Sequence, residues 1–185
     1  MNEYATTPAP GTVRLERLLP GPIDRVWAFL TDPEKRKRWF AGGDMATSGA
    51  FTLQFQHSNL TDEPGPERFR TAIEGFPSPC RMVRWEPPHV LAFDWLNAPH
   101  TPGADEPPAQ LVTWELFERG DKVLFVITHT RLPTRAEMID VSGGWHAHTD
   151  ILEALLSGAK PRPFWANIER LEKHYGEAYP QNAAG

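Results

Sequence analysis

The chain has 185 residues, of which 40% are hydrophobic and 23% charged, a balance typical of one globular domain with or without tails. Its formal net charge of −5 argues against non-specific nucleic-acid binding, because that activity requires a clustered basic surface. One cysteine excludes a disulfide framework, and without a visible secretory signal or membrane-spanning apolar run we expect a cytoplasmic protein that does not insert into a membrane.

The N-terminal part is predicted to contain one strand and two short helices. Residues 1–11 are rich in alanine and proline, and we expect them to form a flexible tail. Alternation over residues 12–19 predicts a strand, and apolar residues spaced i, i+3, i+4 and i+7 over residues 23–30 predict an amphipathic helix. Asp32 is placed to cap a second short helix, whose basic run 35–38 we expect to be a solvated face.

The middle of the chain changes to a hydrophobic period of two, which predicts consecutive antiparallel strands. These strands are expected at residues 51–56, 69–74, 81–86, 90–96, 112–118 and 124–129. A turn-rich, proline-containing loop is expected at residues 97–108.

The C-terminal part is predicted to be helical. At about 100° per residue, three side chains fall on one side of the first helical segment, which we expect to face the sheet: Trp145, His148 and Leu152. The stretch KPRP at residues 160–163 interrupts the helix, so we expect one long helix with a break, or two helices in line. A sheet that is apolar on one face must be covered, and this helix is the long element available to cover it.

Four segments in this order resemble the activator of heat-shock-protein-90 ATPase homologue family, which belongs to the START-like superfamily, also called SRPBCC. They are PIDRVWAFLTDPEKRKRWF (22–40), WEPPHVLAFDW (85–95), VTWELFERGDKVLFVITHTRL (112–132) and GGWHAHTDILEALLSG (143–158). The resemblance implies the α+β helix-grip fold. In that fold a curved antiparallel sheet of six to seven strands wraps around a long C-terminal helix, and two short helices follow the first strand.

The resemblance also implies a division of the chain and a place for a ligand. Residues 12–158 are expected to form the START-like ligand-binding domain, followed by a helical extension at 159–179 and a tail at 180–185. A hydrophobic cavity is implied between the sheet and the C-terminal helix. No cofactor is common to all members of the family, so none is expected here.

The stretch SGGWHAHTD (142–150) holds two histidines and an aspartate, but we do not predict a metal site there. His146 and His148 are two residues apart and point about 200° away from each other on a helix, so they cannot bind one ion. His146 and Asp150 are spaced i, i+4, and we expect them to pair on the outer face of the helix.

The candidate ligand-binding residues are the inward-facing side chains of the strands and of the C-terminal helix. They are Phe55, Trp95, Trp114, Phe125, His129, Trp145, His148 and Leu152. Rigid indole rings with one polar N–H suit aromatic or amphipathic ligands. His129 and His148 each have two interpretations, a core histidine with satisfied nitrogens or a polar group that hydrogen-bonds a ligand.

We therefore expect the chain to bind a small apolar or aromatic molecule. One alternative, suggested by the family name, is a co-chaperone-like module that stimulates a chaperone ATPase. Another is a cyclase-like or aromatase-like enzyme that uses His129 and His148, although no catalytic residue is assigned, because no nucleophile elbow, phosphate-binding loop or zinc-protease motif is present. A homodimer formed through residues 159–179 is a further expectation.

Overall fold

The computed structural model describes residues 3–96 and 109–181, so the predicted loop at 97–108 lies outside the described residues. The strands are β1 (Val13–Pro20), β2 (Gly49–Phe55), β3 (Phe76–Glu86), β4 (Val90–Trp95), β5 (Gln110–Arg119) and β6 (Lys122–Thr130). The helices are α1 (Ile23–Thr31), α2 (Pro33–Arg36), α3 (Arg70–Glu74), α4 (Arg135–Ser157) and α5 (Phe164–Ala178), with 3-10 turns η1 (His57–Asn59) and η2 (Glu67–Phe69).

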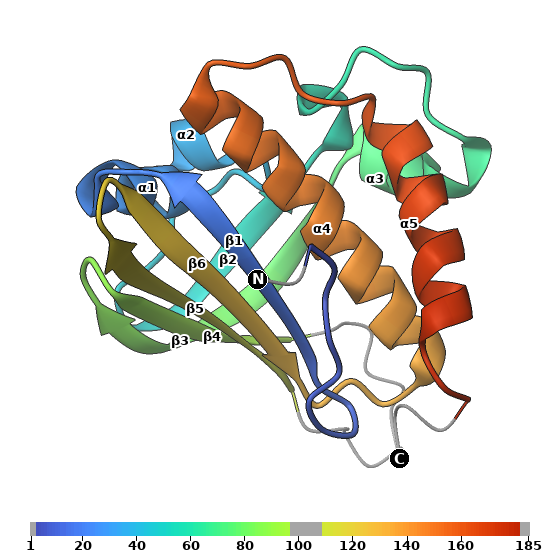
Figure 1. Ribbon diagram of the computed structural model, residues 1–185, viewed down its shortest axis with the longest axis horizontal. Helices are drawn as coiled ribbons and strands as arrows, with labels where there is room; N and C mark the ends of the chain where they lie inside the picture. The colour runs from blue at the N-terminus through green and yellow to red at the C-terminus, as the bar shows by residue number, and fades with distance from the viewer. Residues whose placement is uncertain (1–2, 97–108, 182–185) are drawn as a thin grey trace.

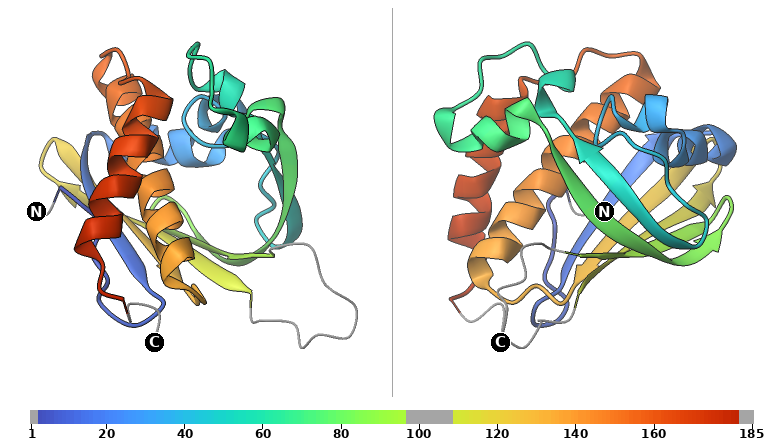
Figure 2. Two further views of the ribbon diagram at one scale, coloured as in Figure 1. Left: turned by 90° about the vertical axis from the view of Figure 1, so that its right-hand side faces the viewer. Right: turned by 180° about the vertical axis from the view of Figure 1, so that it is seen from behind.

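The strands form one antiparallel sheet in the order β1-β6-β5-β4-β3-β2. The sheet is strongly curved, and α4 crosses its concave face, as Figures 1 and 2 show. The apolar residues of alternating strand positions meet α4, α1 and the segment after α2 in one core. The predicted α+β arrangement of a curved sheet around a long C-terminal helix, with two short helices after the first strand, is confirmed.

The strand predicted at residues 69–74 is wrong, because this segment forms η2 and α3. Phe69 and Ile73 are four residues apart, so they lie on one side of a helix as readily as on one side of a strand. Phe69 stacks on Trp165 of α5 with ring centroids 5.0 Å apart, and Ile73 also packs against the core. A run of six residues does not distinguish the period of a strand from that of a helix. Here the packing of Phe69 and Ile73 decides in favour of the helix.

The prediction of a solvated face for the basic run 35–38 is wrong for Arg36, which is fully buried. Its guanidinium donates to four backbone carbonyls, those of Leu30, Thr31, Ala41 and Gly43. Burial lowers the pKa of Arg36 to about 10, so the group remains charged at neutral pH. Arg36 thereby ties the end of α1 to the segment that enters β2.

The two C-terminal helices are not in line, because α5 lies alongside α4 (Figures 1 and 2). The chain leaves α4 through Gly158, whose φ of 70° is the left-handed conformation common at helix ends. The face of α4 that the sequence predicts to be exposed is consequently covered. His146 is buried there, its Nδ1 lying 2.8 Å from the Tyr175 hydroxyl oxygen of α5 and its Nε2 3.7 Å from Asp150 Oδ1.

The described part of the N-terminal segment, residues 3–11, packs on the domain, contrary to the expectation of a flexible tail over residues 1–11. Ala5 is buried, and its N–H donates to the Tyr175 hydroxyl oxygen at 2.9 Å. Thr6 pairs with Arg14 of β1 as an isolated bridge. The composition of this segment did not predict the packing, because it depends on backbone hydrogen bonds and on one aromatic side chain, Tyr4, which stacks on His174 of α5 with ring centroids 3.7 Å apart.

Replacing Tyr175 with phenylalanine is expected to destabilise the fold by about 1–3 kcal/mol, because the Ala5 N–H and a His146 nitrogen lose their shared partner. Urea unfolding followed by tryptophan fluorescence measures this change. A loss below about 0.5 kcal/mol, the range of an ordinary surface substitution, would show that the hydroxyl does not fasten the N-terminal segment.

Candidate functional site

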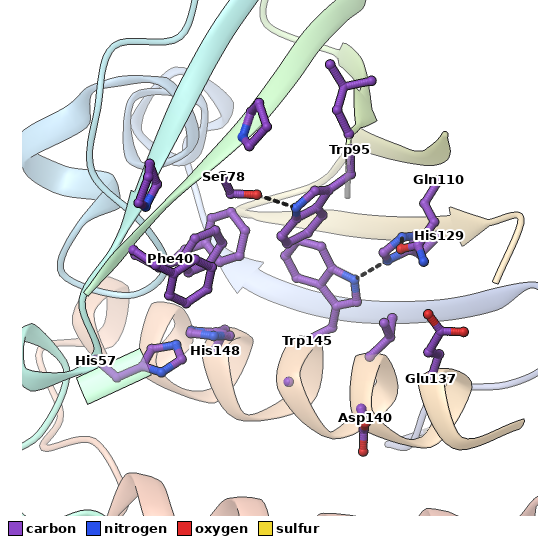
Figure 3. A pocket seen from close by; sticks show the side chains of 17 residues that line it. Phe40, His57, Ser78, Trp95, Gln110, His129, Glu137, Asp140, Trp145 and His148 are labelled. Carbon is purple, nitrogen blue, oxygen red and sulfur yellow. Dashed lines mark hydrogen bonds between the residues drawn. The ribbon is translucent and has the colours of Figure 1, made fainter. Parts of the chain in front are cut away.

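A cavity of about 490 Å³ lies between the concave face of the sheet and α4, and Figure 3 shows it from close by. Its walls come from β2, β3 and β4, from the start of β5 and the end of β6, and from one side of α4. Aromatic rings make up much of the lining, including Phe40, Phe55 and Phe76. The protein's own side chains therefore leave a largely apolar pocket that is open to solvent on one side.

Five of the eight predicted site residues line this cavity, namely Phe55, Trp95, His129, Trp145 and His148. The other three, Trp114, Phe125 and Leu152, are fully buried but do not line it. Trp39 fills the space beside two of them, with ring centroids 5.7 Å from Trp114 and 6.5 Å from Phe125. The hollow therefore occupies one end of the concave face, while the segment after α2 closes the other end.

Several lining residues were not predicted, among them His57, Gln110, Glu137 and Asp140. The period of two in β2, continued beyond Phe55, places His57 on the inward side, so that signal was present in the sequence. The two acidic residues were missed because α4 begins at Arg135, where Thr134 caps it by accepting from the Glu137 N–H.

His129 is held in a chain of hydrogen bonds between Trp145 and Gln110. The Trp145 indole N–H donates to His129 Nδ1 at 3.2 Å, which requires that nitrogen to be bare. The ring hydrogen therefore sits on Nε2, which donates to Gln110 Oε1 at 2.9 Å. Burial lowers the pKa of His129 to about 3, so the ring is neutral and both its nitrogens are satisfied.

Trp95 forms the adjoining wall of the cavity. Its ring stacks on His129, with centroids 5.8 Å apart and planes 5° apart, and its indole N–H donates to Ser78 Oγ at 2.6 Å. Two indole rings, those of Trp95 and Trp145, thus present their faces and edges to the cavity while their N–H groups bond to the protein (Figure 3). A ligand meets mainly carbon along this wall.

His148 lies at the other end of the cavity, close to His57, with ring centroids 5.3 Å apart. Its Nδ1 is 2.7 Å from the carbonyl oxygen of Trp39, and a carbonyl only accepts, so Nδ1 carries the hydrogen. Burial, with His57 nearby, lowers the pKa of His148 to about 3. The His148 ring is therefore neutral, and its Nε2 has no hydrogen-bond partner among the described residues.

Two acidic residues from the first turns of α4, Glu137 and Asp140, contribute to the cavity lining, and the Asp140 carboxylate points away from the indole rings (Figure 3). Burial raises the pKa of Asp140, and the nearby Glu172 raises it further, while Arg68 opposes the shift.

Among residues 3–96 and 109–181 no lysine or arginine lines the cavity, and these residues hold no cluster of three or more metal-ligating side chains. Nor does any helix in these two ranges have the length and apolar character needed to cross a bilayer.

The chain is similar to known proteins both in sequence and in fold. The model of the family described as Activator of Hsp90 ATPase homolog 1-like protein matches residues 20–157. The solution NMR structure of the protein encoded by gene BPP1335 from Bordetella parapertussis is similar, at 42% identity and a TM-score of 0.77, over 95% of this chain and 90% of that one. No curated protein is significantly similar in sequence.

The crystal structure of CalU16 from Micromonospora echinospora is a more distant neighbour. It is 23% identical with a TM-score of 0.62, and the match covers 95% of this chain and 92% of that one. At this identity the likeness is one of fold, and it confirms the helix-grip arrangement of sheet and long helix.

Proposed function

The chain belongs to the family of Activator of Hsp90 ATPase homolog 1-like proteins, and on that premise we propose that it binds a small apolar or aromatic molecule in the cavity beneath α4. Hydrophobic ligands are common among proteins of this family. The observation that carries the proposal is the pocket of about 490 Å³, lined largely by aromatic side chains, that the described residues leave unfilled. Pockets of this size and lining are typical of small-molecule sites.

The driving force for binding is the removal of apolar surface from water. Burying about 300 Å² of ligand surface at ~25 cal/mol/Å² contributes roughly 7–8 kcal/mol before the costs of association. The lost freedom of the ligand and the ordering of side chains take back several kcal/mol, so a Kd in the micromolar range is expected.

The enzyme alternative is weaker than binding because neither of its two candidate histidines, His129 and His148, is a poised base. His129 uses both nitrogens within the protein, and the pKa of His148, lowered to about 3, makes it a poor proton acceptor at neutral pH. The chaperone alternative rests on the family name, and the homodimer through residues 159–179 stays a prediction.

Gly144 provides a direct test, because it lines the cavity from α4 and a Cβ built on it meets no atom within 4 Å. Gly144→Leu is expected to fill the hollow and to weaken binding of the apolar dye N-phenyl-1-naphthylamine by at least about tenfold. The fold should be retained or stabilised, since leucine is a better helix former than glycine by up to ~1 kcal/mol. Dye fluorescence measures binding, and thermal unfolding measures stability.

Gly176→Leu is the matched control. Gly176 is also helical, lies in α5 away from the cavity, and likewise has no atom near its added Cβ. This variant should bind the dye as the wild type does. The proposal is contradicted if the wild type gives no fluorescence increase at saturating dye, or if Gly144→Leu binds as tightly as Gly176→Leu.

A further inference from the structure

The end of the cavity opposite the two carboxylates carries polar groups that the chain leaves unused (Figure 3). His57, from η1, and His148, from α4, both line the cavity there. Neither nitrogen of His57 has a hydrogen-bond partner among the described residues, although both atoms are buried. An unmet buried polar group costs free energy, so a bound group that satisfies it would be stabilised at this point.

The hydrogen positions on the two rings define what this end of the cavity can bind. Because His148 donates from Nδ1 to the Trp39 carbonyl, its Nε2 presents a lone pair. Burial lowers the pKa of His57 to about 4, so His57 is neutral at pH 7 and has one N–H donor and one acceptor. His148 therefore offers an acceptor, and the buried His57 nitrogens offer a donor when the ring turns toward the cavity.

The charges around the cavity limit the ligand further. No cationic side chain lines it within the described part of the chain, whereas Glu137 and Asp140 do. Arg68, the cation that acts on Asp140, is exposed and pairs with Glu172 at 2.7 Å. An anionic group inside the cavity would lose its hydration without gaining a cation, which is unfavourable.

We propose that the cavity takes an uncharged phenol or aromatic alcohol, whose hydroxyl binds between His57 and His148. The hydroxyl hydrogen is donated to His148 Nε2, and the oxygen accepts the His57 N–H. A hydroxyl suits the pair because it combines one donor with acceptor lone pairs on a single atom. The aromatic body of the ligand then lies along Phe55, Trp95 and Trp145, which also line the cavity.

This inference rests on the proposed function, since it specifies the ligand of the same cavity. Three probes that share a naphthalene ring test it: 2-naphthol, 2-methoxynaphthalene and 2-naphthoate, each competing with N-phenyl-1-naphthylamine at pH 7. We expect 2-naphthol to bind about tenfold more tightly than its methyl ether, because methylation removes the hydrogen donated to His148. At the concentration where 2-naphthol is saturating, 2-naphthoate should displace no dye.

The variants His57→Phe and His148→Phe should lower the affinity for 2-naphthol to that of the ether and leave the ether's affinity unchanged. His57 follows β2 on a partly exposed turn, so its variant serves if His148→Phe does not fold. His89→Phe, at an exposed position outside the cavity, is the control and should keep the preference for the hydroxyl.

The outcomes separate this inference from the function on which it rests. Equal affinities of 2-naphthol and its ether for the wild type, or binding of 2-naphthoate as tight as that of 2-naphthol, would overturn the hydroxyl site while dye binding still supported an apolar cavity. The hydroxyl site is likewise contradicted if both histidine variants keep the preference for 2-naphthol. Failure of the dye and of all three probes to bind would overturn both proposals.

Discussion

Lowering the pH from 7 to 5 is expected to remove about 4 kcal/mol of folding stability through His129 and His148 alone. Burial lowers the pKa of each ring to about 3, whereas an unfolded histidine titrates near 6.5. Between these values the unfolded state binds more protons, so stability falls as the pH falls. At pH 5 each ring contributes a loss of about 2 kcal/mol.

The structure explains why these rings resist protonation. A second hydrogen on His129 would face the indole N–H of Trp145, donor against donor, and would place a charge in the core. His148 is similarly enclosed, and its accepting nitrogen faces no carboxylate within hydrogen-bonding distance among the described side chains.

Urea unfolding at pH 7 and at pH 5 measures the effect. The variant His129→Leu should lower stability at both pH values, but it should reduce the difference between them by about 2 kcal/mol, because one of the titrating groups is gone. Replacement of the exposed His89 with glutamine should leave the difference unchanged. Stability that does not vary between pH 5 and 7 would show that the buried histidines titrate normally.

Replacing Arg36 with methionine is expected to cost about 3–5 kcal/mol, although the side-chain volume is similar. The carbonyls of Leu30 and Thr31 lie at the C-terminal end of α1, where no backbone donor of the helix reaches them. Arg36 satisfies them together with two carbonyls of the following segment. Methionine would leave two buried and two partly buried carbonyl acceptors without this donor.

Arg38 provides the matched control, since it lies in the same basic run but is exposed. Arg38→Met should change the free energy of unfolding by less than about 0.5 kcal/mol. Arg36→Lys should recover little of the stability, because an ammonium cannot reach several carbonyls in the way a planar guanidinium does. If Arg36→Met and Arg38→Met are equally stable, the network around Arg36 does not hold the fold.

The strands and helices were largely predictable because each has a clear period. β1 and β5 alternate over seven or more residues and β2 over six, whereas the short segment at 69–74 fits the period of a strand and that of a helix equally well. The burial of Arg36 was not predictable, because a run of four basic residues gives no indication of which one meets carbonyl groups from distant positions.

The candidate site was predictable in part. Alternation placed Trp95 and His129 on the inward face, and the helical projection placed Trp145 and His148 opposite them. It could not show that Trp39 and its neighbours fill one end of the concave face, since that depends on the path of the chain after α2. The burial of His146 was not predictable either, because a helical projection of α4 alone does not reveal that α5 covers its far side.

The packing of α5 and of the N-terminal segment has a consequence for how much chain is needed to fold. The span shared with the family ends at residue 157, yet α5 buries His146, and Tyr175 in turn fastens Ala5. A fragment cut to residues 12–158 would expose the flank of α4 that now excludes solvent. We therefore expect the cooperative folding unit to be larger than the span shared with the family, with its two ends stabilising each other.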